Sequence, residues 1–104
     1  MADLELKLGE EIKECVRADY WSKKLGMYSQ NRGRIWITNQ RIHVRAGWSY
    51  DFDIEMSQIA SLKKSNISLI LPIGIDVILK NGKKHRLAVM KRNQRMELIQ
   101  SLMK

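Results

Sequence analysis

The sequence predicts a small all-β domain closed by one C-terminal helix. Between residues 12 and 89 the dominant period of the apolar residues is two, which is typical of half-buried strands. After residue 90 the period changes, and apolar residues between Met96 and Met103 recur at three- and four-residue spacing, as in an amphipathic helix. About seven short antiparallel strands, arranged as a barrel or sandwich and capped by the helix, account for both patterns.

The strand pattern recurs in segments separated by turn-forming residues. We predict strands at residues 12–20, 34–38, 41–45, 50–54, 60–64, 74–79 and 84–89, and a loop between the first two around Gly26 and residues 29–31. Residues 56–59 are predicted to form a single turn. Asn81-Gly82 is a strong hairpin signal because both residues tolerate positive φ. Asn93 is predicted to cap the N-terminus of the helix at residues 92–103.

Length and cysteine content indicate one domain that does not depend on oxidation. The 104 residues suit a single domain spanning residues 1–104, with residues 1–7 expected to be flexible. A lone Cys15 cannot form an internal disulfide. The N-terminus lacks a signal-peptide pattern, and the longest apolar stretch, residues 67–75, is too short to span a bilayer. We therefore expect a cytoplasmic protein.

Positive charge is the main clue to the partner. The net charge is +8, and residues 21–50 contain six bases and no acid. Such a surface favours anionic partners, which include lipid head groups, nucleic acid and acidic protein patches. Solubility alone is the simpler interpretation of the same charge.

Residues 33–44, GRIWITNQRIHV, resemble the signature stretch of GRAM domains. That stretch has a glycine, an aliphatic-aromatic-aliphatic strand ending in threonine, a two-residue turn, and a basic residue that opens the next strand. The segments Leu8-Gly9-Glu10-Glu11-Ile12 and Asn81-Gly82-Lys83-Lys84 and the terminal helix fit the same family, so that the resemblance covers residues 8–103.

The resemblance implies a pleckstrin-homology-like split barrel of two near-orthogonal antiparallel sheets, with the C-terminal helix plugging one end. In such folds the loops joining strands one and two, three and four, and six and seven cluster at the open end. Many pleckstrin-homology domains bind phosphoinositides there, and other members of the superfamily bind proteins.

Placed on this sequence, the three loops form a basic cup with an aromatic rim. The expected lipid-binding residues are Lys23, Lys24, Arg32, Arg34, Lys83 and Lys84, and the expected membrane-insertion residues are Met27, Tyr28 and Trp48. Basic side chains attract an anionic leaflet, and Trp and Tyr rings suit its interface. We expect loose electrostatic docking, peripheral at the membrane, because Lys24 lies in a loop. In the alternative interpretation the lysines are solvated and Trp48 covers a hairpin.

Two apolar features leave other partners open. The stretch from Ile67 to Ile75 is either a buried strand or an exposed patch that serves a protein partner or a homo-oligomer. Trp36 either points outward as a contact residue or packs beneath the first loop or the helix.

The sequence predicts no enzyme, no catalytic residues, no metal and no cofactor. His43 and His85 stand alone, without metal-ligand spacing, and no phosphate-binding glycine loop or serine elbow occurs. Nucleic acid is disfavoured as a partner, because aromatic and basic residues interleave only partly along the predicted sheet, at Arg34-Trp36 and Arg41-His43-Arg45.

Overall fold

The structure is a computed structural model, which describes residues 4–67 and 71–103. Its described chain forms eight strands, one single-turn 3-10 helix and one α-helix. In order these are β1 (Ile12–Lys24), β2 (Met27–Asn31), β3 (Gly33–Thr38), β4 (Arg41–Ala46), β5 (Tyr50–Glu55), η1 (Met56–Gln58), β6 (Ile59–Ile67), β7 (Leu71–Leu79), β8 (Lys84–Val89) and α1 (Arg92–Leu102).

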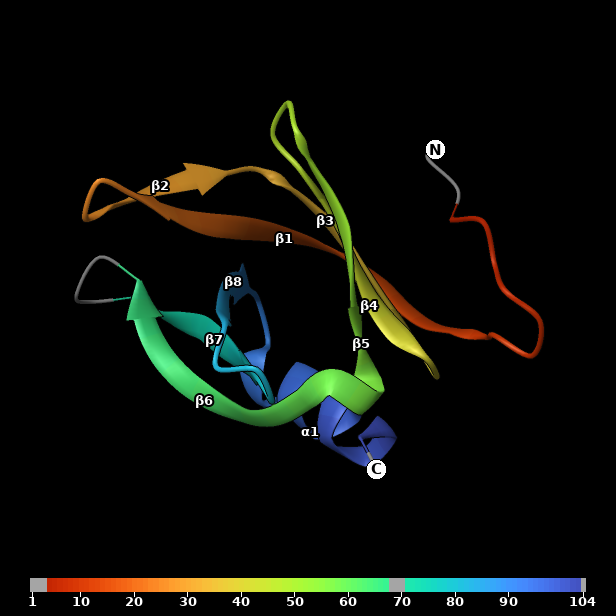
Figure 1. The fold of residues 1–104 in the computed structure, drawn as a ribbon. Helices are drawn as coiled ribbons and strands as arrows, with labels where there is room; N and C mark the ends of the chain where they lie inside the picture. Colours follow the sequence, from red (N-terminus) through yellow and green to blue (C-terminus); the bar gives the residue numbers. More distant parts are fainter. Residues whose placement is uncertain (1–3, 68–70, 104) are drawn as a thin grey trace.

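The strands form one strongly curled antiparallel sheet in the order β5-β4-β3-β1-β8-β7-β6, with β2 paired to the outer end of β1 (Figure 1). The long strand β1 joins the two halves, because residues 12–17 pair with β3 and residues 18–21 pair with β8. We call β3, β4, β5 and the first part of β1 the first sheet. This arrangement confirms the predicted all-β fold with a C-terminal helix, a pleckstrin-homology-like split barrel.

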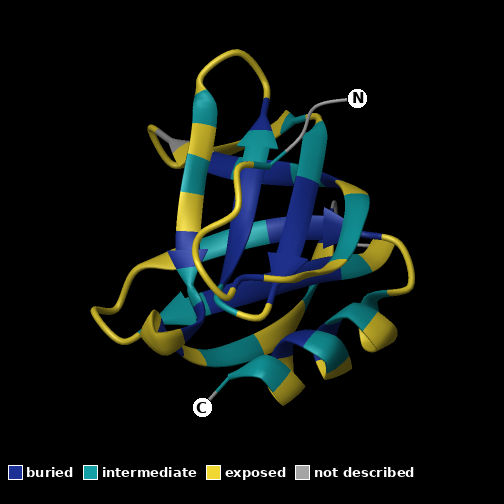
Figure 2. Ribbon diagram, turned by 90° about the vertical axis from the view of Figure 1, so that its right-hand side faces the viewer, coloured by how far each residue is buried: buried dark blue, intermediate teal, exposed yellow. Residues whose placement is uncertain are grey.

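Alternating apolar residues on the strands form the core inside the curl. The inward residues of β3 and β4, such as Ile35 and Val44, are fully buried, as are Val77 of β7 and Leu87 of β8. Figure 2 shows this buried inner surface and the more exposed outer parts of the strands. Period-two patterning in the sequence therefore marks true half-buried strands.

The helix α1 closes one end of the barrel. Met96 and Ile99 are buried in the core, and Arg95 on the same helix pairs with Glu14 of β1 at 3.2 Å. An isolated helix of 11 residues is marginal in water, so this packing supplies most of its stability. The N-cap is Lys91, in a left-handed conformation, and the prediction of Asn93 as the cap was wrong, because Asn93 lies inside the first turn.

The segment between the first two predicted strands differs from the prediction. The predicted loop is a hairpin, in which β1 continues to Lys24, Leu25-Gly26 forms the turn, and β2 returns over Met27–Asn31. Residues 27–30 are all exposed, so no face of β2 carries the apolar alternation that marks a half-buried strand. Strands β6 and β7 are also longer than predicted, at Ile59–Ile67 and Leu71–Leu79.

Gly33 permits a close approach of β3 to β4, just where the chain leaves the hairpin. A Cβ at this position would lie 2.1 Å from the main-chain oxygen of Arg45 and 2.6 Å from Cα of Ala46. Only glycine fits there without displacing the neighbouring strand. The β1–β2 hairpin and the first sheet are thus joined at a fixed, tightly packed point.

Candidate functional site

The β1–β2 hairpin projects from the barrel and has an apolar tip (Figure 1). Beyond Trp21, β1 pairs with β2 alone among the described residues, so the last three residues of β1 belong to the hairpin only. Leu25 (φ 52°) and Gly26 (φ 79°) form a two-residue turn of the type whose twist matches paired strands. Leu25 is fully exposed and Met27 is 74% exposed. The tip therefore presents two large apolar side chains to water.

Basic and aromatic side chains surround the base of this tip, in a cavity of about 360 Å³ that we call the end pocket. Its lining includes Lys23, Tyr28, Lys84 and Arg86, which come from β1, β2 and β8. The Arg86 guanidinium lies 4.5 Å from the centre of the Tyr28 ring, and Lys23 Nζ lies 5.7 Å from it. Both distances suit cation–π attraction between the ring and the two cations.

The bases of the end pocket differ in how far they are already paired. Arg86 donates two hydrogen bonds to Asp76, at 2.8 and 3.1 Å, and these bonds raise the pKa of Arg86. Lys84 Nζ lies 3.9 Å from the same carboxylate. Lys23 has no acidic partner among the described residues and is exposed. Lys23 is thus an exposed cation that no described acid neutralises, as is Lys83 in the neighbouring β7–β8 turn.

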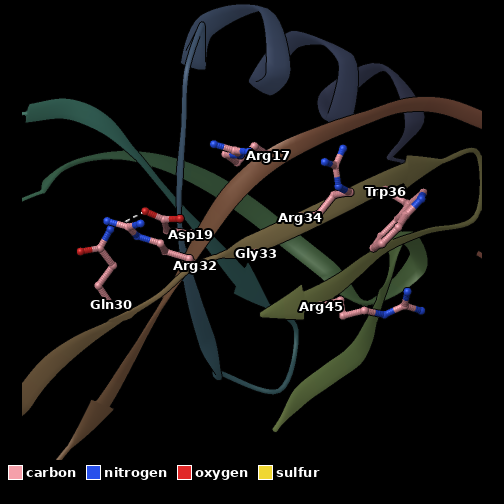
Figure 3. A pocket seen from close by; sticks show the side chains of 8 residues that line it. All are labelled: Arg17, Asp19, Gln30, Arg32, Gly33, Arg34, Trp36 and Arg45. Atoms are coloured by element: carbon pink, nitrogen blue, oxygen red, sulfur yellow. Dashed lines mark hydrogen bonds between the residues drawn. The ribbon is translucent and has the colours of Figure 1, made fainter. Parts of the chain in front are cut away.

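A second groove, of about 740 Å³, lies on the outer face of the first sheet and is lined by four arginines (Figure 3). We call it the arginine groove; its lining residues are Arg17, Asp19, Gln30, Arg32, Gly33, Arg34, Trp36 and Arg45. Arg17 pairs in register with Arg34, and Arg34 with Arg45, so three arginines form one row across β1, β3 and β4. Asp19 accepts a hydrogen bond from the Gln30 amide.

Trp36 resolves the alternatives left open by the sequence. Its side chain lies on the outer face, since its neighbours Ile35 and Ile37 are in the core, yet only 3% of Trp36 is exposed. The Arg45 guanidinium lies over the indole, 4.8 Å from the ring, and His43 is 5.6 Å away. Trp36 is therefore not an exposed contact residue, and its ring serves as a platform for Arg45.

A buried ion-pair network ties the N-terminal segment to the same outer face. Arg41 donates to Glu10 at 2.7 and 2.9 Å and to Asp53 at 2.9 and 3.0 Å. Hydrogen bonding from Arg41, with help from Lys7 N and Thr38, lowers the pKa of Glu10 to about 2 although burial opposes the shift. Arg41 also donates to the Glu5 carbonyl at 2.7 Å, so part of the segment expected to be flexible is anchored.

The structure brings some of the predicted site residues together and separates others. Lys23, Tyr28 and Lys84 share the end pocket, whereas Arg32 and Arg34 lie in the arginine groove. Lys83 is exposed in the β7–β8 turn. The β4–β5 turn, which carries the fully exposed Trp48, and the β1–β2 tip point in different directions in Figure 1. The side chain of Lys24 is outside the described residues.

Sequence reasoning missed four residues of these sites. Leu25 was placed in the first loop but was not among the predicted membrane-insertion residues. Arg86 was placed in a strand and was given no role in a site. Arg17 and Arg45 were likewise not placed beside Arg34. The signal for the arginine row was present, since all three residues occupy outward positions of predicted strands, but their alignment depends on a register that one sequence does not give.

The apolar stretch at residues 67–75 is largely core at its ends. Ile67 and Ile75 are buried, which supports the interpretation as strand, and Leu71 is 47% exposed. Residues 68–70, the middle of the predicted patch, lie outside the described residues. Because Ile67 and Ile75 are buried, the two ends of this stretch cannot contribute to an apolar interface with a partner.

The two histidines have different neighbours. His43 lies 2.6 Å from a carboxylate oxygen of Asp51 and 2.6 Å from one of Asp53, within the ion-pair network of Arg41. His85 Nδ1 lies 2.9 Å from the Tyr20 hydroxyl, and burial, helped by Lys83, lowers the pKa of His85. Within residues 4–67 and 71–103, no three His, Cys, Asp or Glu side chains are grouped as metal ligands would be. No helix in this part of the chain has the length and apolar character needed to cross a bilayer.

No protein-family model and no curated protein matches the sequence. Among solved structures, this chain is similar to the crystal structure of the C-terminal domain of an unknown protein from Leishmania infantum. The TM-score is 0.74 at 18% sequence identity, and the match covers 91% of this chain and 85% of that chain. At this identity the similarity shows a shared fold.

Proposed function

We propose that this chain is a non-enzymatic docking module that binds an anionic membrane surface through the β1–β2 hairpin. The observation that carries the proposal is the apolar tip of Leu25 and Met27, which projects beyond the barrel with Lys23 beside it. The resemblance of residues 33–44, in β3 and β4, to GRAM domains supports a membrane-peripheral role on the cytoplasmic side.

The energetics favour insertion of the tip. Burying an exposed Leu or Met side chain contributes about 1.5–3 kcal/mol, so that two of them suffice for weak but measurable binding. The Tyr28 ring lies at the base of the tip, at the level where aromatic rings suit the interface between lipid and water.

Electrostatics would orient the molecule. Lys23 and Lys84 open onto the end pocket, and each base near an anionic leaflet contributes about 1 kcal/mol. Arg86 is neutralised by Asp76 and serves mainly to hold Tyr28. Lys83, in the neighbouring turn, would add charge at the rim. Trp48 lies on a separate turn, and the proposed contact does not need it.

A docking role for a protein partner is the second candidate. Among the described residues β5 pairs only with β4, and β6 only with β7, so that each offers a free backbone edge at the split of the barrel. Such edges accept an added strand from another chain or a second copy. This interface would survive salt and would appear as a dimer or complex in sedimentation.

Vesicle co-sedimentation tests the membrane proposal. We expect binding to phosphatidylcholine vesicles that contain phosphatidylserine, with little binding to phosphatidylcholine alone, and weaker binding as salt screens the charges. The double variant Leu25→Ser/Met27→Ser should bind at least tenfold more weakly, because the loss of about 1.4 kcal/mol lowers affinity tenfold. Lys23→Glu should weaken binding only to the anionic vesicles.

Met90 provides the matched control, since it is 70% exposed but lies between β8 and α1. Met90→Ser should bind vesicles like the wild type, as should Lys64→Glu on β6. Equal loss in Met90→Ser and in the tip variant, or binding that ignores both changes, would contradict insertion of the hairpin. A salt-resistant dimer that binds no vesicle would favour the second candidate.

A further inference from the structure

The row of arginines on the first sheet has few counter-charges. Arg17, Arg34 and Arg45 are direct cross-strand neighbours, and Arg32 lines the same groove. Among the described residues, ion pairs reach only the end of this row, where Arg45 Nε lies 3.6 Å from Asp51. The Arg34 guanidinium contacts Cys15 Sγ at 3.7 Å.

Elsewhere the same chain pairs its arginines closely. Arg41 is held by Glu10 and Asp53, and Arg86 by Asp76, each through two or more hydrogen bonds. The cluster in the groove is therefore not a general property of this basic protein. Like charges directly opposite one another on neighbouring strands destabilise a sheet, so that the row is unfavourable in the free protein.

We propose that the arginine groove binds an anion that carries two or more phosphate groups. Guanidinium forks match phosphate oxygens in paired hydrogen bonds, and the three arginines stand on adjacent strands about 5 Å apart. The volume of about 740 Å³ is in the range of small-molecule sites and exceeds what one phosphate fills.

Trp36 preorganises one wall of this site. It is covered by Arg45, at 4.8 Å, so that the guanidinium is held against a rigid buried ring instead of moving freely in water. A cation fixed in advance loses less conformational freedom when it binds. Arg34 stands in the centre of the row, in register with both Arg17 and Arg45, and should contribute most.

The groove favours a compact polyphosphate over nucleic acid. Single-stranded nucleic acids bind by stacking bases on exposed aromatic rings. Trp36 is the aromatic residue that lines this groove, and Arg45 already covers its ring. Of the remaining lining, the four arginines and the Gln30 amide suit phosphate oxygens, whereas the Asp19 carboxylate, which accepts a hydrogen bond from Gln30, opposes an anion at its end of the groove. Bases would find no free ring on the described lining of the groove.

This proposal is independent of hairpin insertion, because the groove lies on the outer face of the first sheet and not at the tip. The two can fail separately. Leu25→Ser/Met27→Ser should keep full polyphosphate binding, and Arg34→Gln should keep insertion into phosphatidylserine vesicles. The polyphosphate could be free in solution or part of a lipid head group, and the test distinguishes these sources.

Thermal unfolding and NMR with inorganic tripolyphosphate test the site. At a concentration several-fold above Kd, tripolyphosphate should raise Tm by about 4–8 °C, whereas sodium chloride at equal ionic strength should not. The Nε–Hε signals of Arg17, Arg34 and Arg45 should shift on titration, and those of Arg41 and Arg86 should not. Equal Tm shifts with both salts, without selective Arg shifts, would overturn the proposal.

Three variants make the test specific. Arg34→Gln should lower tripolyphosphate affinity at least tenfold. Arg34→Lys should retain only part of the wild-type affinity, because lysine keeps the charge but lacks the paired N–H donors of the guanidinium group. Lys64→Gln, exposed on β6, removes the same charge and should bind like the wild type. If Arg34→Gln folds poorly, Arg17→Gln takes its place with the same expectation. Wild-type affinity in either folded variant would overturn the site.

Two further arms identify the source of the phosphate groups. Phosphatidylcholine vesicles that carry a bisphosphorylated inositol lipid should compete with tripolyphosphate for the Arg34 signals if the head group is accepted. Indifference of the vesicles would assign the site to a free polyphosphate and still support it. A single-stranded RNA that binds more tightly than tripolyphosphate, and is lost in Arg34→Gln, would replace the proposal with nucleic-acid binding.

Discussion

At the scale of single residues, the chain uses arginine in two opposite ways. Arg41 is almost fully buried, and its partner Glu10 has a fully buried side chain. The free-energy cost of removing both charges from water is offset only because nearly every hydrogen bond of the two groups is made. Arg34 and its neighbours lie in an open groove with little local compensation. The first arrangement fastens the N-terminal segment, and the second leaves positive charge exposed in a groove.

The Glu10–Arg41 pair should make the free energy of unfolding depend on pH in the acidic range. The pKa of Glu10 is about 2 in the folded chain and about 4.3 when unfolded, so its contribution is complete above about pH 5 and is lost as the pH falls toward 2. Glu10→Gln should lower the free energy of unfolding by about 3 kcal/mol at pH 7, because the buried Arg41 guanidinium loses one of its two carboxylate partners and keeps only Asp53.

Urea denaturation at several pH values measures this effect. The difference between wild type and Glu10→Gln should narrow as the pH approaches 2, where Glu10 becomes protonated. Glu97→Gln, on the exposed side of α1, is the control and should change little. A difference that stays constant from pH 7 to pH 2 would show that the carboxylate charge is not the source of the stability.

At the scale of elements, the prediction from sequence was good where strands are half-buried and poor where they are not. The strand Lys84–Val89 was placed correctly because the inward residues His85, Leu87 and Val89 alternate with Lys84, Arg86 and the small Ala88, directly after the Asn81-Gly82 turn. β2 was missed because exposure on both faces removes that alternation. Candidate site residues followed the same division: Lys23, Tyr28 and Lys84 were grouped from their expected loops and do line one pocket, whereas the arginine row needed the register of three strands.

The junction of β2 and β3 makes a prediction at the same scale. Gly33→Ala should destabilise the protein by about 1–3 kcal/mol or more, since the added methyl group would overlap the main chain of β4. The double variant Gly33→Ala/Ala46→Gly should not regain the loss, because the nearest atom is the Arg45 carbonyl oxygen at 2.1 Å. Recovery in the double variant, measured by urea denaturation, would place the clash on the Ala46 side chain instead.

At the scale of the whole molecule, one continuous sheet and one helix share one core. β1 takes part in both halves of the barrel, and α1 inserts Met96 and Ile99 between them. The overall fold was predictable because the change of period near residue 90 and the order of turn signals are local. The sequence does not predict which strand edges remain unpaired at the split of the barrel. This depends on the order of the strands in the folded sheet, and no local sequence pattern gives that order.

This shared core should make unfolding a single cooperative transition. In urea, far-UV circular dichroism, which reports the sheet and α1, should coincide with tryptophan fluorescence, which Trp36 in the first sheet dominates through its burial. Ile99→Ala should shift both curves together to lower urea concentration, since it opens a cavity where helix and sheet meet. Separate midpoints for the two signals would mean that the helix or one sheet unfolds alone.

The turn residue Leu25 combines two features that a stable, purely structural protein would not retain. Its backbone is left-handed, which costs about 1 kcal/mol for a residue with a Cβ, and its side chain gains no contact in the free molecule. Asn or Gly would relieve the backbone and reduce the aggregation hazard of an exposed leucine. Selection for stability alone would therefore favour Asn or Gly at this turn, and the proposed insertion of the hairpin into a membrane would account for a leucine here.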